Sequence, residues 1–293
     1  MPKVRGDFLY LISFLSPVII VFSLFYYYPL ALDFYYSFTD WNLITTPKFI
    51  GFENYLRLFS DEIFIKSLVL TSVYVIVVLL GSIFIGLVLS FVIDRPTKLA
   101  TLTRIVIFIP YVIPDVAAAA IWSIVFAPGP SGYVNYLLSS IGLGTYSWFQ
   151  DPNLAFPMII AYSIWKYFGF CTLVLYSGIK AIPKEYIEAA KVDGASEFNI
   201  FTRITLPLLR PIIVFITSTN LMSCWFVFSS VYTLTKGGPG TATMVMGMYI
   251  YEQAFKRMKA GLATAAAIIN TIVVLLLVIF IHLRGYRGGL YGR

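Results

Sequence analysis

The sequence has 293 residues, of which 59% are hydrophobic and 12% are charged, and its mean hydropathy is +0.84. Soluble globular chains carry about 25% charged residues, so this composition excludes an ordinary soluble domain. The net charge of +7 mostly reflects Lys and Arg residues in predicted loops, and a basic surface with interleaved aromatic residues, which would indicate nucleic-acid binding, is missing from the sequence.

Six apolar stretches are long enough to cross the membrane, which takes about 20 helical residues for roughly 30 Å of hydrocarbon. They lie near 8–28, 67–93, 105–127, 154–179, 212–234 and 262–283. Most contain Pro or Gly, which spanning helices tolerate where neighbouring helices satisfy the freed backbone groups. We therefore predict an all-α polytopic membrane protein with six transmembrane helices, as a single domain over 1–293 with core helices within about 63–283.

The first stretch follows Lys3 and Arg5, as a secretory signal would, but its apolar part exceeds 15 residues and no small-residue cleavage site closes it. We expect it to remain as a membrane helix. With the N-terminus inside, thirteen Lys and Arg residues lie in cytoplasmic segments against seven outside, and the cluster at 256–259 is an exception to this bias. The sequence thus predicts a multi-pass protein of the cell membrane with both termini in the cytoplasm.

Residue types that carry catalysis or bind metals are sparse in the sequence. The turn at 237–240 is rich in glycine but lacks the following Lys and Ser or Thr of a phosphate-binding loop. Cys171 and Cys224 lie in separate apolar stretches and are expected to be packing residues, and His282 has no ligand partner nearby in sequence. We predict no catalytic residues and no metal site in this chain, and no cofactor bound by it.

A charged segment at about 181–210 separates the fourth and fifth stretches. Pro183 can begin a helix, Glu185 places negative charge in its first turn, and Gly194 can end it. A second helix can start with Ser196 as its N-cap. We predict a helix at about 183–193, a bend, and a further helix that leads into the fifth span.

Two readings of this segment remain open from the residues alone. It can be a solvated loop with good caps, or a docking element. Connecting two helices needs few residues, whereas apolar Tyr186, Ile187, Ala189 and Ala190 recur here at helical spacing. A short amphipathic helix outside the membrane needs a partner surface for that face, which favours docking.

The same segment resembles a known motif. Glu188, Ala189 and Ala190, then Gly194, and after nine residues Ile204, Leu206 and Pro207, follow E-A-A-x-x-x-G…I-x-L-P. This resembles the EAA motif of the transmembrane subunits of bacterial and archaeal ABC importers. LTKGGPGTATMVMGMYIYEQAF at 234–255 and FIGFENYLRLFSDEIF at 49–64 resemble the carbohydrate branch of that family, which includes the maltose, lactose and glycerol-3-phosphate permeases.

The resemblance implies a type I ABC importer permease with a cytoplasmic coupling helix between helices 4 and 5. It implies a second homologous permease subunit, two ATP-binding subunits that hold ATP and Mg, and an extracytoplasmic solute-binding protein that delivers a sugar. It also assigns contact with the ATPase subunits to eight residues: Glu188, Ala189, Ala190, Asp193, Gly194, Ile204, Leu206 and Pro207.

A sugar path needs hydrogen-bonding groups in an otherwise apolar bundle. Eight polar or aromatic residues within the spans are candidates: Asp115, Trp122, Tyr162, Trp165, Lys166, Asn220, Ser223 and Trp225. Lys166 and Asp115 stand out because charge at membrane depth is costly. They can equally pair with each other, or with a second permease subunit, instead of contacting sugar.

Two other functional classes remain as alternatives. An ion-coupled secondary sugar carrier predicts internal repeats and carboxylates within the membrane, and the sequence shows neither clearly. A membrane-embedded enzyme would need clustered His, Asp or Cys, which the sequence lacks.

Overall fold

The computed structural model describes residues 4–93 and 98–286, and within these ranges the regular secondary structure is helical apart from one isolated bridge between Thr39 and Phe49. The all-α prediction is therefore confirmed. The chain divides into two compact units, one of Met1–Glu62 with Ile250–Thr271 and one of Ile63–Tyr249 with Ile272–Arg293. The single domain over 1–293 stays a prediction. Both chain termini, which the sequence places in the cytoplasm, lie outside the described residues.

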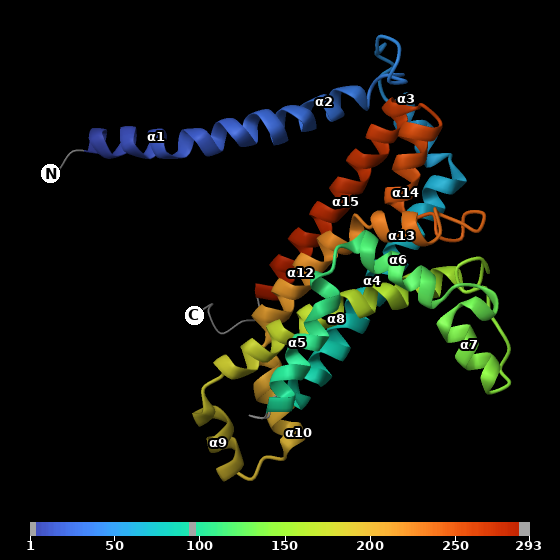
Figure 1. Ribbon diagram of the computed structural model, residues 1–293. Coiled ribbons are helices and arrows are strands. Elements are labelled where there is room, and N and C mark those ends of the chain that lie inside the picture. The colour runs from blue at the N-terminus through green and yellow to red at the C-terminus, as the bar shows by residue number, and fades with distance from the viewer. Residues whose placement is uncertain (1–3, 94–97, 287–293) are drawn as a thin grey trace. The chain divides into compact units, whose positions relative to one another are not determined.

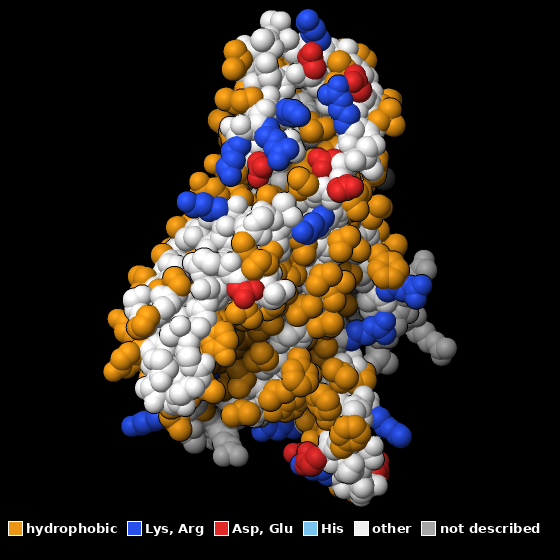
Figure 2. Space-filling view, turned by 90° about the vertical axis from the view of Figure 1, so that its right-hand side faces the viewer, with side chains coloured by type: hydrophobic (Ala, Val, Ile, Leu, Met, Phe, Trp, Pro, Cys, Tyr) orange, Lys and Arg blue, Asp and Glu red, His pale blue; other side chains and the backbone are white. Residues whose placement is uncertain are grey.

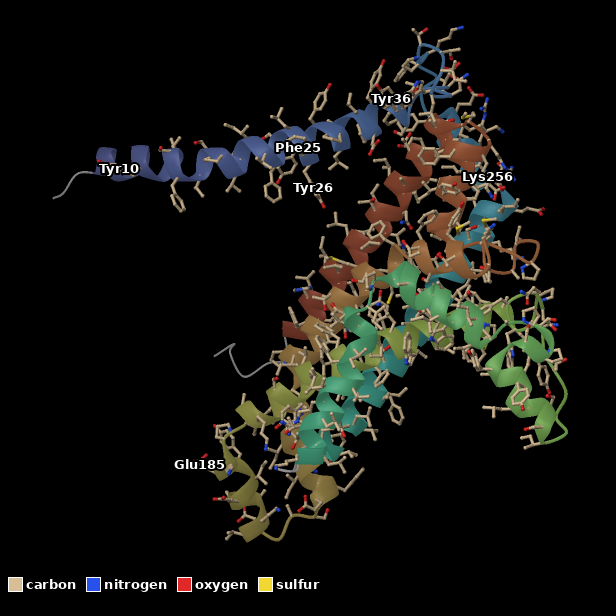
Figure 3. All side chains as sticks on the ribbon, in the orientation of Figure 1. Tyr10, Phe25, Tyr26, Tyr36, Glu185 and Lys256 are labelled. Atoms are coloured by element: carbon tan, nitrogen blue, oxygen red, sulfur yellow. The ribbon has the colours of Figure 1, made fainter. Side chains whose placement is uncertain are left out.

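The first unit begins with a long helical arm. It consists of α1 (Val4–Phe22), η1 (Ser23–Tyr27) and α2 (Tyr28–Tyr36). Its stretch Ile12–Tyr36 is long and apolar enough to cross a membrane, and none of its most apolar window is buried. Figure 3 shows Tyr10, Phe25 and Tyr26 projecting from the arm. The arm ends at Tyr36, eight residues beyond the predicted end of the first span.

The side-chain amide of buried Asn54 holds the loop that follows α2 in place. Asn54, on α3 (Glu53–Phe59), donates to the carbonyl oxygens of Ser37 at 2.9 Å and Thr39 at 2.7 Å. Gly261, near the start of α15 (Ala260–Tyr286), donates its backbone N–H to the carbonyl of Trp41 at 2.9 Å. These bonds satisfy backbone groups that leave regular structure, so the loop is fixed within this unit.

The second unit is a helical bundle. Figure 1 shows α4, α5, α8 and α12 running alongside one another, with α9 and α10 at one end of the unit and α6 and α13 towards the other. The bounds are α4 (Glu62–Val92), α5 (Lys98–Val112), α6 (Asp115–Val125), η2 (Gly129–Ser131), α7 (Tyr133–Ser140), α8 (Ala155–Ala181), α9 (Lys184–Val192), α10 (Glu197–Ile200), η3 (Phe201–Thr205), α11 (Leu206–Leu208), α12 (Arg210–Trp225) and α13 (Ser229–Leu234). Beyond them, α14 (Met246–Tyr251) and η4 (Glu252–Lys256) lead to α15.

Glycines on α4 and α8 let the backbones of the bundle meet. A Cβ atom added to Gly86 would lie 2.7 Å from the Cβ of Cys171, and one added to Gly169 would lie 1.8 Å from the carbonyl oxygen of Ile107. Small residues at such contacts are how helices associate in membranes, where the hydrophobic effect does not drive them together. Helix α8 therefore packs directly against both α4 and α5.

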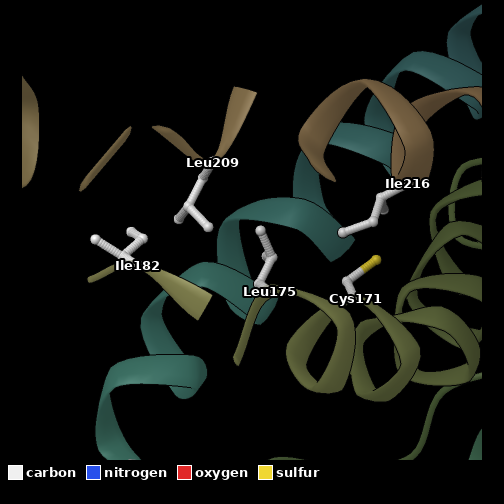
Figure 4. Close-up of a cluster of buried hydrophobic side chains, with 5 residues drawn as sticks. All are labelled: Cys171, Leu175, Ile182, Leu209 and Ile216. Atoms are coloured by element: carbon white, nitrogen blue, oxygen red, sulfur yellow. The ribbon is translucent and has the colours of Figure 1, made fainter. Parts of the chain in front are cut away.

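Buried apolar side chains join α8 to α12. Cys171, Leu175, Ile182, Leu209 and Ile216 form one cluster (Figure 4), and Ile187 of α9 packs against it. The prediction that Cys171 is a packing residue is confirmed, because it is fully buried in this cluster.

Four described helices are long and apolar enough to span a membrane, or up to six if each of two bent pairs is one span. The bent pairs are Lys98–Val112 with Asp115–Val125, at 101°, and Glu197–Leu208 with Arg210–Trp225, at 60°. The predicted third stretch, 105–127, is thus sharply broken before Pro114. The predicted fifth stretch, 212–234, does not form one helix, because α12 ends at Trp225 and α13 begins at Ser229.

Candidate functional site

The segment between α8 and α12 has the local structure that its sequence predicts. Helix α9 follows Pro183 and ends where Gly194 adopts a φ of +74°, and the N–H of Ala195 bonds back to the carbonyl of Ala190 at 2.9 Å. The hydroxyl of Ser196 accepts from the N–H of Asn199 at 3.3 Å, which makes Ser196 the N-cap of α10. The predicted helix, its glycine stop and the Ser196 cap are confirmed.

The motif residues of this segment present an accessible surface. Glu188, Ala189, Asp193, Gly194 and Pro207 are exposed, and Ala190, Ile204 and Leu206 are half-buried. Figure 2 shows acidic and basic side chains gathered at the lower end of the view, where Figure 1 places α9 and α10 of the second unit. Figure 3 shows Glu185 on the outside of α9. The side chains that the sequence marks for contact are therefore available to a partner.

A concave surface lies behind α9. A hollow of about 370 Å³ is lined by Tyr186 of α9 and by Arg203, Ile204, Pro207 and Leu208 from η3 and α11. A salt bridge of 3.0 Å between Lys191 and Glu197 links the two sides of the bend. Both side chains are largely exposed, so we assign this pair little stability.

The second candidate site is a polar cavity of about 180 Å³ inside the bundle. Its wall combines residues of α4, α6 and α8 with the break between α12 and α13. The lining residues are Tyr74, Asp115, Tyr162, Ser163, Lys166, Tyr167, Ser223 and Phe226 through Ser230. A larger hollow of about 700 Å³ along α5 is almost wholly apolar, so it offers a hydroxylated solute few hydrogen-bonding partners. The smaller cavity is the better candidate, because it provides them.

Hydroxyl groups organise this cavity. Tyr162 donates to the side-chain Oδ1 of Asp115 at 2.7 Å, and its hydroxyl lies 2.9 Å from the carbonyl oxygen of the same residue. Tyr74 donates to the hydroxyl of Ser163 at 2.8 Å. These side chains are held in place by one another, so the cavity is pre-formed.

Lys166 is only 6% exposed, and its ammonium contacts backbone. It donates to the carbonyl oxygen of Pro110, in the last turn of α5, at 2.8 Å, and to that of Ile113, which directly follows α5. Within the described residues, Lys166 and Asp115 form no direct ion pair. The ammonium of Lys166 is paired inside the protein with backbone carbonyls. The pair with Asp115, one of the three alternatives left open by the sequence, does not form.

Aromatic rings flank the carboxylate side of the cavity. The ring of Trp122 lies 5.4 Å from that of Tyr162, edge to face, and 5.5 Å from that of Trp165. Of the eight residues predicted for the path, six therefore come together: Asp115, Trp122, Tyr162, Trp165, Lys166 and Ser223.

Two predicted path residues lie elsewhere. Asn220 is buried and donates to the sulfur of Cys171 at 3.2 Å, and Trp225 is buried outside the cavity wall. Sequence reasoning missed five polar wall residues: Tyr74, Ser163, Tyr167, Ser229 and Ser230. Hydroxyl groups within apolar stretches could have indicated these residues. Such groups often bond to the backbone of their own helix, however, as the hydroxyl of Ser163 does to the carbonyl of Ile159, so they do not single out a cavity.

The family pattern described as "Binding-protein-dependent transport system inner membrane component" matches residues 82–284. The chain belongs to this family. The matched range contains both the α9 segment and every wall residue of the polar cavity except Tyr74. The permease is thus a membrane-spanning subunit of an ABC importer and not a catalytic subunit.

Among its relatives is the sulfoquinovosyl glycerol transport system permease protein SmoG of Agrobacterium fabrum (strain C58 / ATCC 33970), 35% identical over 90% of this chain and 86% of that protein. A crystal structure of a bacterial ABC transporter involved in import of the acidic polysaccharide alginate contains a similar chain, with a TM-score of 0.85, 29% identity and 97% of both chains covered. In a second crystal structure the alginate transporter is in complex with an alginate pentasaccharide-bound periplasmic protein. The similar chain there has a TM-score of 0.83 and 29% identity over 97% of this chain and 96% of that one.

These findings decide between the classes that the sequence left open. Membership of the family and near-complete coverage of ABC importer chains confirm the resemblance on which the importer interpretation rested. The alternative of an ion-coupled secondary carrier finds no support among them.

Proposed function

We propose that this permease imports a sugar that an external binding protein delivers. Two relatives support this proposal. SmoG is named as a permease of a sulfoquinovosyl glycerol transport system, and the structurally similar transporter is involved in the import of alginate. The cavity supports it as well, since hydroxyls and a carboxylate beside aromatic rings suit the polar edges and apolar faces of a sugar ring. The observation that carries the proposal is this polar cavity within a chain similar to sugar permeases along almost its whole length.

Asp115 and Ser223 are the proposed solute contacts of this chain. The carboxylate of Asp115 can accept further hydrogen bonds besides the one from Tyr162, and Ser223 is exposed at the cavity wall. Trp122 and Trp165 supply flat apolar surface nearby. Asn220 and Trp225 lie behind the wall in this structure, so their part in the path is proposed to be support of α12.

We further propose that α9 is the coupling helix. It protrudes from the bundle with Glu188 and Ala189 exposed, while Ile187 on its other side packs against the cluster that joins α8 to α12. A partner that pushes on the exposed face would therefore act on both long helices. The proposed partners on this side are two ATP-binding subunits, which hold ATP and Mg, whereas this chain itself binds no cofactor.

The proposed assembly also contains a second homologous permease subunit. In this arrangement α9 and both chain termini lie in the cytoplasm, and the binding protein docks on the opposite side of the membrane. The periplasmic protein bound to the alginate transporter supports the last partner.

Reversing the charge of Glu188 tests the coupling role. In proteoliposomes that contain the complete transporter, Glu188→Lys is expected to lower ATP-driven sugar uptake about tenfold or more. The reason is that losing one partner of a hydrogen-bonded charge pair buried at an interface costs about 2–5 kcal/mol. Membrane insertion should be unchanged, since Glu188 is exposed. Glu53→Lys on α3 makes the same charge change at another exposed site and should leave uptake intact.

Two outcomes would contradict the proposal. Full uptake by the Glu188→Lys transporter would remove α9 as the coupling helix. Sugar uptake driven by an ion gradient in proteoliposomes that contain this chain alone would remove the importer role altogether.

A further inference from the structure

The break between α5 and α6 leaves backbone groups without their helical partners. In a continuous helix the carbonyl of Pro110 would accept from the N–H of residue 114, but Pro114 has no N–H. The chain turns by 101° at this point, inside a stretch that is otherwise apolar enough to span. Without water, each unsatisfied carbonyl costs several kcal/mol, so the break requires donors from elsewhere in the protein.

Helix α8 supplies a donor to the end of α5. The ammonium of Lys166 bonds to the carbonyl oxygens of Pro110 and Ile113, and that of Tyr111 lies 3.5 Å away. An ammonium has three N–H donors, and positive charge is favourable at the carbonyl end of a helix. The donors of Lys166 are thus directed at α5, away from a solute in the cavity.

The same face of α8 also holds the start of α6. Tyr162 lies four residues before Lys166, so the two side chains are neighbours on the helix surface. The hydroxyl of Tyr162 lies within 2.9 Å of both the carbonyl oxygen and Oδ1 of Asp115. Gly169 lets α8 approach α5 closely enough for these contacts, because its missing side chain makes room for the carbonyl of Ile107.

We propose that Tyr162 and Lys166 form a clamp that fixes the angle between α5 and α6 and thereby positions Asp115 at the wall of the cavity. Lys166 is a positioning residue and not a solute contact. The clamp makes the break a fixed elbow: α5, α6 and α8 move as one body during transport, and the motion that admits and releases solute occurs elsewhere. This assignment does not depend on which solute is carried.

Distances across the elbow test the clamp in the complete transporter with its partner subunits. Spin labels on cysteines at Ile105 of α5 and Ile124 of α6, both more than half exposed, report the angle by pulsed electron resonance. The native cysteines are buried and remain in place. The wild-type labels should give one narrow distance that is the same without nucleotide, with ATP and after trapping with ADP and vanadate.

Removing the ammonium should release the elbow. Lys166→Met is expected to give a distance distribution roughly twice as wide, because several elbow angles become populated. Lys166→Arg should restore the narrow distance, since it keeps the charged donors. Tyr162→Phe should broaden the distribution less, and Lys180→Met, a matched loss of lysine on the same helix, should not broaden it.

A distribution in Lys166→Met as narrow as in the wild type would overturn the clamp. The clamp would also be overturned if the wild-type distance changed between nucleotide states. A change as large as the width of the Lys166→Met distribution would be enough. If Lys166→Met does not assemble, Lys166→Arg and Tyr162→Phe decide the question. A narrow distribution in Lys166→Arg with a broadened one in Tyr162→Phe supports the clamp, and any other pattern refutes it.

Discussion

Two helix breaks in this permease fall at different helix-breaking residues and are stabilised differently. Between α5 and α6 the chain breaks at Pro114, and between α9 and α10 it breaks at Gly194. At the first break the donors come from Lys166 and Tyr162, about 50 positions away in sequence. At the second break the hydrogen bonds are local, from Ala195 back to Ala190 and from Asn199 to Ser196.

The difference follows from the surroundings. The α9 segment is exposed, so water can satisfy any group that the local caps leave over. The α5–α6 break lies in an apolar stretch, where another helix must supply each partner. A break among apolar helices therefore requires hydrogen bonds between helices that are distant in sequence, whereas an exposed break needs only bonds between neighbouring residues.

The largest effect is expected where α8 meets α5. Gly169→Ala places a Cβ 1.8 Å from the carbonyl oxygen of Ile107, so two backbones must separate, which should cost about 3 kcal/mol or more. Thermal unfolding of the purified complex measures this loss. Gly178→Ala on the same helix meets only the flexible side chains of Ile212 and Leu209 and should be clearly milder. An equal loss of stability in both variants would show that the backbone contact between α8 and α5 contributes no more than an ordinary side-chain contact.

The glycine at the exposed break should matter less and only locally. Gly194→Ala forces a left-handed conformation on alanine at a cost of about 1 kcal/mol, since nothing lies within 4 Å of the added Cβ. We expect faster amide hydrogen exchange in α9 and weaker ATP-driven uptake, with normal insertion. Gly194→Asn should behave almost like the wild type, because Asn tolerates this conformation. If both variants unfold the whole subunit, the local character of this break is wrong.

Loss of the α10 cap should be smaller still. Ser196→Ala removes the acceptor for the N–H of Asn199, which should cost about 1 kcal/mol or less and speed exchange of that amide severalfold. Ser196→Asp keeps an acceptor and should preserve the protection. The elbow distance between α5 and α6 should not respond to either change, and a response would show that the two breaks are coupled.

The smallest effect is expected at Asn220. Its bond to the sulfur of Cys171 joins α12 to α8, and interhelical polar contacts of this kind average about 0.6 kcal/mol. Asn220→Leu should therefore leave the apparent substrate affinity in uptake assays unchanged. Ser223→Ala, at the cavity wall, should weaken that affinity. If Asn220→Leu weakened the affinity and Ser223→Ala did not, Asn220 would be a solute contact after all.

Local patterns in the sequence predict the exposed break well. Pro183, Gly194 and Ser196 act on their immediate neighbours, so their effect can be inferred without knowing the fold. The sequence also marks Asp115 and Lys166 as unusual, because charge in an apolar stretch needs a partner. It does not identify that partner, since the carbonyls that bind Lys166 belong to residues 53 to 56 positions away.

The break between α12 and α13 was not predicted for a related reason. The residues at 226–228 are Phe, Val and Phe, without a glycine or proline to mark an interruption. The helix ends there for tertiary reasons: α13 packs against α6, and Phe226, Val227 and Phe228 help to line the polar cavity. A pattern read along one helix cannot show where another helix will lie.

The connection between α8 and α9 is short and fixed by packing. Only Ile182 and Pro183 separate the two helices, and Ile182 is fixed in the cluster with Leu175 and Leu209. At 1.5 Å per residue, the 27 residues of α8 extend for about 40 Å. Under the proposed coupling role, a displacement of α9 would be transmitted along a stiff helix whose far half carries Tyr162. It would therefore move α5, α6 and α8 together as one body.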